Sequence, residues 1–163
     1  MILSALPDFA QIPCCSAQTL PQEELCAVLA KDRTDEAQLR ELYKKMGHRL
    51  VLREVWKELF PDVPILISSA LSGGYLEDRF RQAAQNRSCY LLIEPMCVRY
   101  PLPFGDAQGE PIDKIPETGF FSKSLCCRYA HSASHVLLWD TEDTLMQKMQ
   151  LAKEAGFLGF AAE

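Results

Sequence analysis

Residues 63–93 contain two short apolar runs that flank a segment with helical periodicity. The runs, 63–69 and 89–93, are rich in Ile, Leu and Val, and prolines and glycines bound the first of them. Between them, the apolar residues of 75–87 recur at helical spacing. A strand, a helix and a strand within about 30 residues form a βαβ unit, which is normally parallel and right-handed. The unit predicts an α/β fold with parallel strands.

Residues 1–62 precede this unit and are predicted to be mainly helical. A proline followed by acids predicts a helix over 21–30, and Thr34 is the expected cap of a second helix over 34–46. The apolar residues of 49–60 fall largely on helical spacing and predict a third helix. We therefore expect a helical N-terminal third followed by βα units.

Residues 99–122 depart from the βα alternation, because they are rich in proline and glycine. "SLCCRY" and "HVLLWD" then predict two short strands around the turn "AHSAS", which is a β-hairpin. We interpret 99–135 as an insertion that this hairpin closes.

The C-terminal end returns to the βα pattern. Thr141 or Asp140 caps a predicted helix that Gly156 ends, and 157–162 predict a last buried strand. The chain is therefore expected to form a single domain, residues 1–163, whose βα part covers 63–163.

Composition and charge exclude several classes of partner. The 163 residues carry a net charge of −5, and Lys and Arg do not cluster, so neither nucleic acid nor an anionic membrane is expected as a partner. No apolar stretch approaches the ~20 residues that span a bilayer, and the N-terminus lacks the basic region of a secretory signal. A cytoplasmic location follows, with the seven cysteines mainly reduced and no cofactor expected.

The last third of the chain resembles a known family. "HVLLWDTEDTLMQKMQLAKEAGFLGFAAE", with "EPMCVRYPLPF" upstream, is similar to the C-terminal end of family-18 glycoside hydrolases, the chitinase-like (β/α)8 barrels, and most of all to their bacterial spore-type members. The resemblance covers residues 89–163. The matching residues are His135, Val136, Trp139, Asp140, Lys148, Leu151, Lys153, Gly156 and Gly159. It implies the C-terminal portion of such a barrel, with an inserted β-hairpin.

The departures from this family bear on activity. Its D-x-x-D-x-D-x-E run, whose Glu protonates the leaving group, is absent, and Glu163 stands where the family usually has a tryptophan under the sugar. A full barrel also needs about 250 residues. The resemblance therefore implies a degenerate or partial chitinase-like module, non-catalytic, that binds carbohydrate of the peptidoglycan or chitin type.

Three acids follow apolar strands and are the candidate catalytic residues: Glu94, Asp140 and Glu163. In parallel α/β folds the carboxyl ends of the strands face the usual active site, where a carboxylate can act as acid or base. Acids are also natural caps of a following helix, so the same pattern has a purely structural explanation.

Two further functions stay open. A small hydrolase could use these acids, or Cys127 activated by His135 as a thiol nucleophile. Cys127, His131 and His135 also offer zinc ligands. The adjacent Cys126 and Cys127 would face opposite sides of a strand and could not easily share an ion. A plain hairpin is therefore preferred, and no metal site is predicted. The third class is a structural protein whose open sheet edges form a homo-oligomer.

Overall fold

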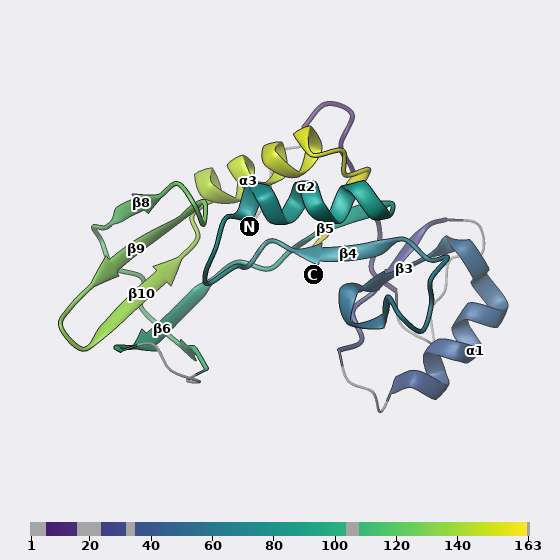
Figure 1. The fold of residues 1–163 in the computed structure, drawn as a ribbon, viewed down its shortest axis with the longest axis horizontal. Helices are drawn as coiled ribbons and strands as arrows, with labels where there is room; N and C mark the ends of the chain where they lie inside the picture. The colour runs from purple at the N-terminus through teal and green to yellow at the C-terminus, as the bar shows by residue number, and fades with distance from the viewer. Residues whose placement is uncertain (1–5, 16–23, 32–34, 104–107, 163) are drawn as a thin grey trace.

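The computed structural model describes residues 6–15, 24–31, 35–103 and 108–162. Two β-sheets and three α-helices are built from these residues (Figure 1). The strands are β1 (Ala10–Gln11), β2 (Cys26–Val28), β3 (Leu50–Arg53), β4 (Ile65–Ser68), β5 (Cys89–Ile93), β6 (Cys97–Pro101), β7 (Glu110–Pro111), β8 (Phe120–Ser122), β9 (Cys127–His131), β10 (His135–Trp139) and β11 (Gly159–Ala162). The helices are α1 (Glu36–Met46), α2 (Leu76–Asn86) and α3 (Glu142–Glu154), with short 3₁₀ turns η2 (Gly47–Arg49) and η3 (Glu54–Trp56).

The first sheet has six parallel strands in the order β1-β11-β5-β4-β3-β2. The predicted βαβ unit is confirmed, because β4 and β5 pair directly in parallel and α2 connects them. Figure 1 shows α2 and α3 side by side over β4 and β5, with α1 beside β3 at one end of the molecule. The strands β2 to β5 are almost entirely apolar, as expected where both faces of a parallel sheet are buried.

The chain around β1 joins the two edges of this sheet. Ile12 N donates a 2.8 Å hydrogen bond to Phe160 O of β11. A few residues on, Cys15 N donates to Ala27 O of β2, and Ala27 N donates to Pro13 O, both at 2.9 Å. Since β1 and β2 stand at opposite ends of the strand order, the curled sheet encloses a small barrel.

The barrel interior is a single apolar layer to which every strand segment contributes. Its buried members are Ile12, Ala27, Val51, Leu66, Leu92 and Ala161. Successive side chains of a strand point to opposite faces, so the residues between them point outward. Those outward residues pack against α2 and α3 on one side and against α1 on the other.

The second sheet lies between β5 and α3 in the chain and, in Figure 1, at the opposite end of the molecule from α1. Its five antiparallel strands have the order β7-β6-β10-β9-β8. The two strands predicted around "AHSAS" are β9 and β10, which pair antiparallel. The Pro- and Gly-rich stretch, interpreted as part of an insertion, contributes β7, β8 and most of β6 to this sheet.

The predicted helical N-terminal third needs correction. The helix predicted over 21–30 is wrong at β2, and the helix predicted over 49–60 is wrong at β3. Both segments are apolar at successive positions, which suits a strand buried on both faces. The helix predicted over 34–46 is confirmed as α1, although the proposed Thr34 cap lies outside the described residues.

Candidate site at the carboxyl ends of the parallel strands

Polar side chains cover the apolar layer at the carboxyl ends of the parallel strands, which we call the mouth of the barrel. Arg53, Ser68 and Glu94 each stand two residues after a member of the layer, on β3, on β4 and directly after β5. Alternation therefore places all three side chains on the inner face of the sheet. The mouth is the usual place for a ligand site in a parallel α/β fold.

Glu94 is the centre of this polar group. Its Oε1 accepts from Nη1 of Arg53 at 3.0 Å and also from Nη2, and Nζ of Lys31 lies 3.7 Å away. The Glu94 side chain is 31% exposed and that of Arg53 is 12% exposed. All these side-chain contacts fall on one carboxylate oxygen, and the Glu94 side chain stays partly open to solvent.

The backbone of Glu94 is fixed to the end of β4. Its N–H donates to Ser69 Oγ at 2.8 Å, and the same hydroxyl donates to the Glu94 carbonyl at 3.2 Å. Ser69 is fully buried. Two hydrogen bonds to one buried hydroxyl fix the backbone from which the Glu94 carboxylate projects, which favours a preorganised binding group.

Arg53 and Lys31 were missed by sequence reasoning. Arg53 ends the apolar run "LVLR", which was interpreted as helix, so its place at a strand end was not recognised. Lys31 closely follows β2, which was also interpreted as helix. The usable signal was the charge after each continuous apolar run, the same signal that identified Glu94.

Asp140 lies at the end of β10 in the antiparallel sheet, not at the end of a parallel strand. Its carboxylate accepts from Thr144 Oγ1 and from Met96 N, both at 2.9 Å, and Lys148 Nζ lies 2.8 Å from both oxygens. The side chains of Asp140 and Lys148 are 0% exposed. This buried ion pair ties β10, α3 and the chain after β5 together.

The three predicted acids therefore do not share one arrangement. Glu94 faces Arg53 and Lys31 at the mouth, whereas Asp140 is enclosed with its own set of partners. Glu163 lies outside the described residues. Glu94 is thus the predicted site residue that the structure places at the mouth, and the catalytic role given to the three acids stays a prediction.

The cysteine and histidine candidates are spread along one hairpin. The register pairs His131 with Val136, so His135 sits at the turn, level with Ser132. Cys127 starts β9, five residues before Ser132, and so lies roughly 16 Å away at about 3.3 Å per residue. His135 Nδ1 instead lies 3.1 Å from Ser132 Oγ. Among the described residues no three His, Cys, Asp or Glu side chains gather as a metal site would need.

The Cys127 thiol also lacks the environment of a nucleophile. It is fully buried, and burial raises its pKa to about 11, with the Lys148 ammonium opposing that rise. A reactive cysteine has a lowered pKa and an accessible sulfur. The thiol hydrolase hypothesis therefore finds neither the histidine partner nor the electrostatics that it requires.

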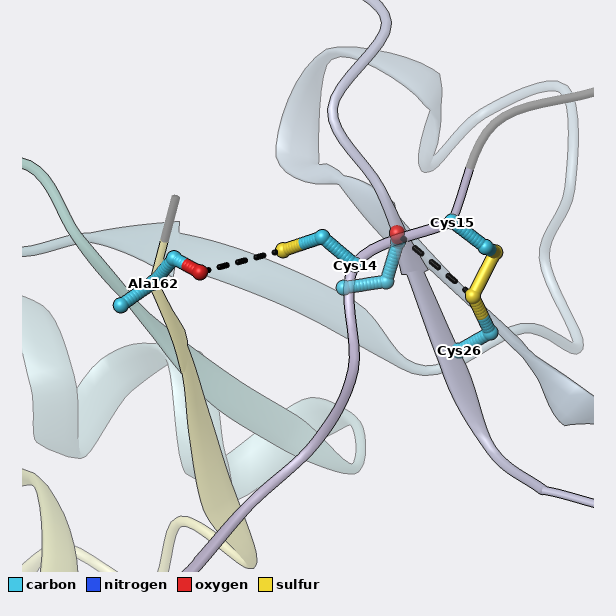
Figure 2. The surroundings of a disulfide bond; sticks show 5 residues. Cys14, Cys15, Cys26 and Ala162 are labelled. Atoms are coloured by element: carbon cyan, nitrogen blue, oxygen red, sulfur yellow. Dashed lines mark hydrogen bonds between the residues drawn. A yellow bond between two sulfur atoms is a disulfide. The ribbon is translucent and has the colours of Figure 1, made fainter. Parts of the chain in front are cut away.

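A disulfide joins Cys15 to Cys26 where the chain after β1 meets β2 (Figure 2). Cys14, beside it, donates its thiol to the Ala162 carbonyl of β11 at 3.5 Å. The expectation of reduced thiols is wrong for Cys15 and Cys26. Disulfides are rare in the cytosol, so this bond does not favour the cytoplasmic location, which stays a prediction.

No helix in the described part of the chain is long and apolar enough to cross a membrane.

Two solved structures resemble this fold. The spore cortex-lytic enzyme SleL of Bacillus cereus is 11% identical, with a TM-score of 0.52 over 85% of this chain and 44% of that chain. SleL of Bacillus megaterium QM B1551 is 8% identical, with a TM-score of 0.46 over 84% of this chain and 54% of that chain. This chain thus spans about half the length of those proteins. No protein-family model and no curated protein matches it.

The likeness to the Bacillus cereus enzyme shows the fold of this chain, a mixed α/β fold with a curled parallel sheet. It agrees with the partial barrel that the sequence resemblance implied. Membership of glycoside hydrolase family 18 stays a prediction.

Proposed function

We propose that this protein is a degenerate, non-catalytic relative of spore-type glycoside hydrolases that binds carbohydrate of the peptidoglycan or chitin type at the mouth of its barrel. The observation that carries the proposal is the inward-facing group of Arg53, Ser68 and Glu94 at the carboxyl ends of the parallel strands. Fixed donors and acceptors of this kind suit the hydroxyl and amide groups of a sugar. The fold shared in part with a cortex-lytic enzyme supports it.

An aromatic face of the second sheet supports the same proposal. Tyr129 contacts Phe120 and His131 on this face, with ring centroids 5.6 and 6.4 Å apart, and Phe120 is 63% exposed. The apolar cluster of this face includes Met96 and Ala70, which follow β5 and β4. The face therefore begins next to the mouth, and its rings offer apolar surfaces on which sugar rings can stack.

The absence of the acidic signature is the reason for proposing binding without hydrolysis. Glu94, the acid at the mouth, is engaged by two cations, and its second oxygen is suited to accept hydrogen bonds from sugar hydroxyls. Incubation with N-acetylglucosamine oligomers should release no new reducing ends. Their release would instead favour the small-hydrolase alternative.

Binding can be measured by calorimetry and by the shift in melting temperature with N-acetylglucosamine oligomers and soluble peptidoglycan fragments. We expect a shift at millimolar ligand, and Glu94→Gln should weaken binding by about tenfold, since hydrogen bonds to charged groups contribute roughly 1.5–3 kcal/mol. Glu110→Gln is the matched control, because Glu110 is an exposed acid paired with Arg99 in the second sheet. No response to either ligand contradicts the proposal.

A homo-oligomer is the second candidate, and β8 is the observation that favours it. This edge strand of the second sheet exposes Phe120 and Phe121, at 63% and 41%. An uncovered apolar edge strand favours pairing with another chain. Light scattering should then give about twice the 18.4 kDa of one chain, and a monomer at high concentration would count against it.

A further inference from the structure

A small pocket lies beside the mouth, between the end of β3, the end of β4 and the start of α2. Its volume is about 250 Å³, and its polar lining consists of Lys31, Arg53, Arg79, Glu54 and Ser68. Pockets that enclose a drug-sized ligand measure roughly 300–1,000 Å³. The pocket therefore suits one substituent of a longer ligand whose remainder lies across the mouth.

Positive charge is in excess around this pocket. Arg79 donates to Glu54 Oε2 at 2.8 Å, and Lys57 lies 3.7 Å from the other oxygen of Glu54. Arg53 and Lys31 share Glu94 in the same way. Four cations thus meet two carboxylates, in a chain whose net charge is −5. A local excess of this sign attracts an anionic group.

The two arginines also have hydrogen-bonding capacity left over. The Nε atoms of Arg53 and Arg79 are buried and lack a hydrogen-bond acceptor. Among the described residues, these two are the buried side-chain nitrogen or oxygen atoms without a hydrogen-bond partner. Both residues line this one pocket. Buried donors normally have a partner, so the two guanidinium groups keep unused donor capacity beside this pocket. The planar fork of a guanidinium matches a carboxylate.

We propose that this pocket binds the carboxylate of an acidic sugar, with Arg79 and Lys31 contacting it and Arg53 shared between it and Glu94. This inference rests on the proposed function and names the ligand class: a glycan that carries a carboxylate on its sugars, as in N-acetylmuramic acid, rather than a neutral glycan such as chitin. Arg79 is 36% exposed and can reach a ligand from the rim of the pocket.

The test compares the disaccharide N-acetylglucosaminyl-N-acetylmuramic acid with its methyl ester, which differs in the charge of one group. Calorimetry on the full chain at low salt should give the acid about tenfold tighter binding than the ester, the value expected for charge-assisted hydrogen bonds. The preference should shrink at high salt. Arg79→Gln should abolish it, whereas Arg81→Gln should leave it unchanged, because Arg81 lies on the same helix but pairs with the exposed Glu77.

The outcomes separate this inference from the proposed function. Equal binding of acid and ester, or a preference that survives Arg79→Gln, overturns the carboxylate site and leaves sugar binding at the mouth in place. Binding of neither ligand overturns both. Melting curves check that the variants are folded, and Lys31→Gln, which changes a side chain that is 68% exposed, replaces Arg79→Gln if that variant does not fold.

Discussion

Asp140 and Lys148 show how one sequence signal leads to two different outcomes. An acid after an apolar strand marks the mouth at Glu94, whereas at Asp140 it forms an ion pair whose two side chains are 0% exposed. Burying an ion pair is costly, and removing one partner leaves an uncompensated charge in the interior. Because Thr144 and Met96 also donate to Asp140, the pair is part of a satisfied network that fixes the start of α3.

We predict that Asp140→Asn or Lys148→Met alone lowers the free energy of unfolding by about 3–5 kcal/mol, because either change leaves one buried group without its counter-charge. The double variant should lose less than the sum of the two, by about 1–3 kcal/mol, since it removes both charges. Urea unfolding monitored by circular dichroism measures all three. Arg81→Gln, which breaks an exposed pair with Glu77, should change stability by less than about 1 kcal/mol. Additive losses would mean that the two side chains do not depend on each other.

At the scale of elements, the amphipathic helices were predictable and the first strands were not. α2 and α3 carry polar and apolar faces at a spacing that only a helix satisfies. Thr141, one of the two predicted caps of α3, is its N-cap and forms a capping box with Thr144. β2 and β3 are apolar at every position except the last of β3. A continuous apolar run fits both the helical and the strand period, so periodicity alone could not decide between them.

The error at β2 and β3 also concealed half of the candidate site. Glu94 was identified because β5 was recognised as a strand, and its end as the place for a ligand. Arg53 ends β3 and Lys31 follows β2, and both segments were interpreted as helices, so the convergence of these cations on Glu94 could not be foreseen. Pairing across the sheet, rather than any local motif, brings these three side chains together from segments that are far apart in the chain.

At the scale of the whole molecule, the barrel has one weak seam. Elsewhere neighbouring strands pair over at least two positions, but the chain after β1 meets β2 at the single bridge between Cys14 and Ala27 in the part of the sheet that the structure describes. The Cys15–Cys26 disulfide lies at this seam, and Lys31 of the mouth follows five residues later. The cross-link thus reinforces the side of the barrel where the described strands pair over the fewest positions.

We predict that reducing this disulfide lowers the free energy of unfolding by about 3 kcal/mol and the melting temperature by roughly 6–12 °C, because the cross-link closes a short loop and restricts the unfolded chain. Melting curves with and without a dithiol reductant measure the effect, and Cys15→Ser should melt at the lower temperature and be insensitive to reductant. Cys97→Ser, at a half-buried thiol outside the seam, should respond to reductant as the wild type does.

Cleavage after Glu23 or Glu24 separates the two cysteines in sequence, so the fragments should stay linked until reduction. Fragments that separate without reductant would contradict the cross-link, and the seam would then depend on its backbone hydrogen bonds alone.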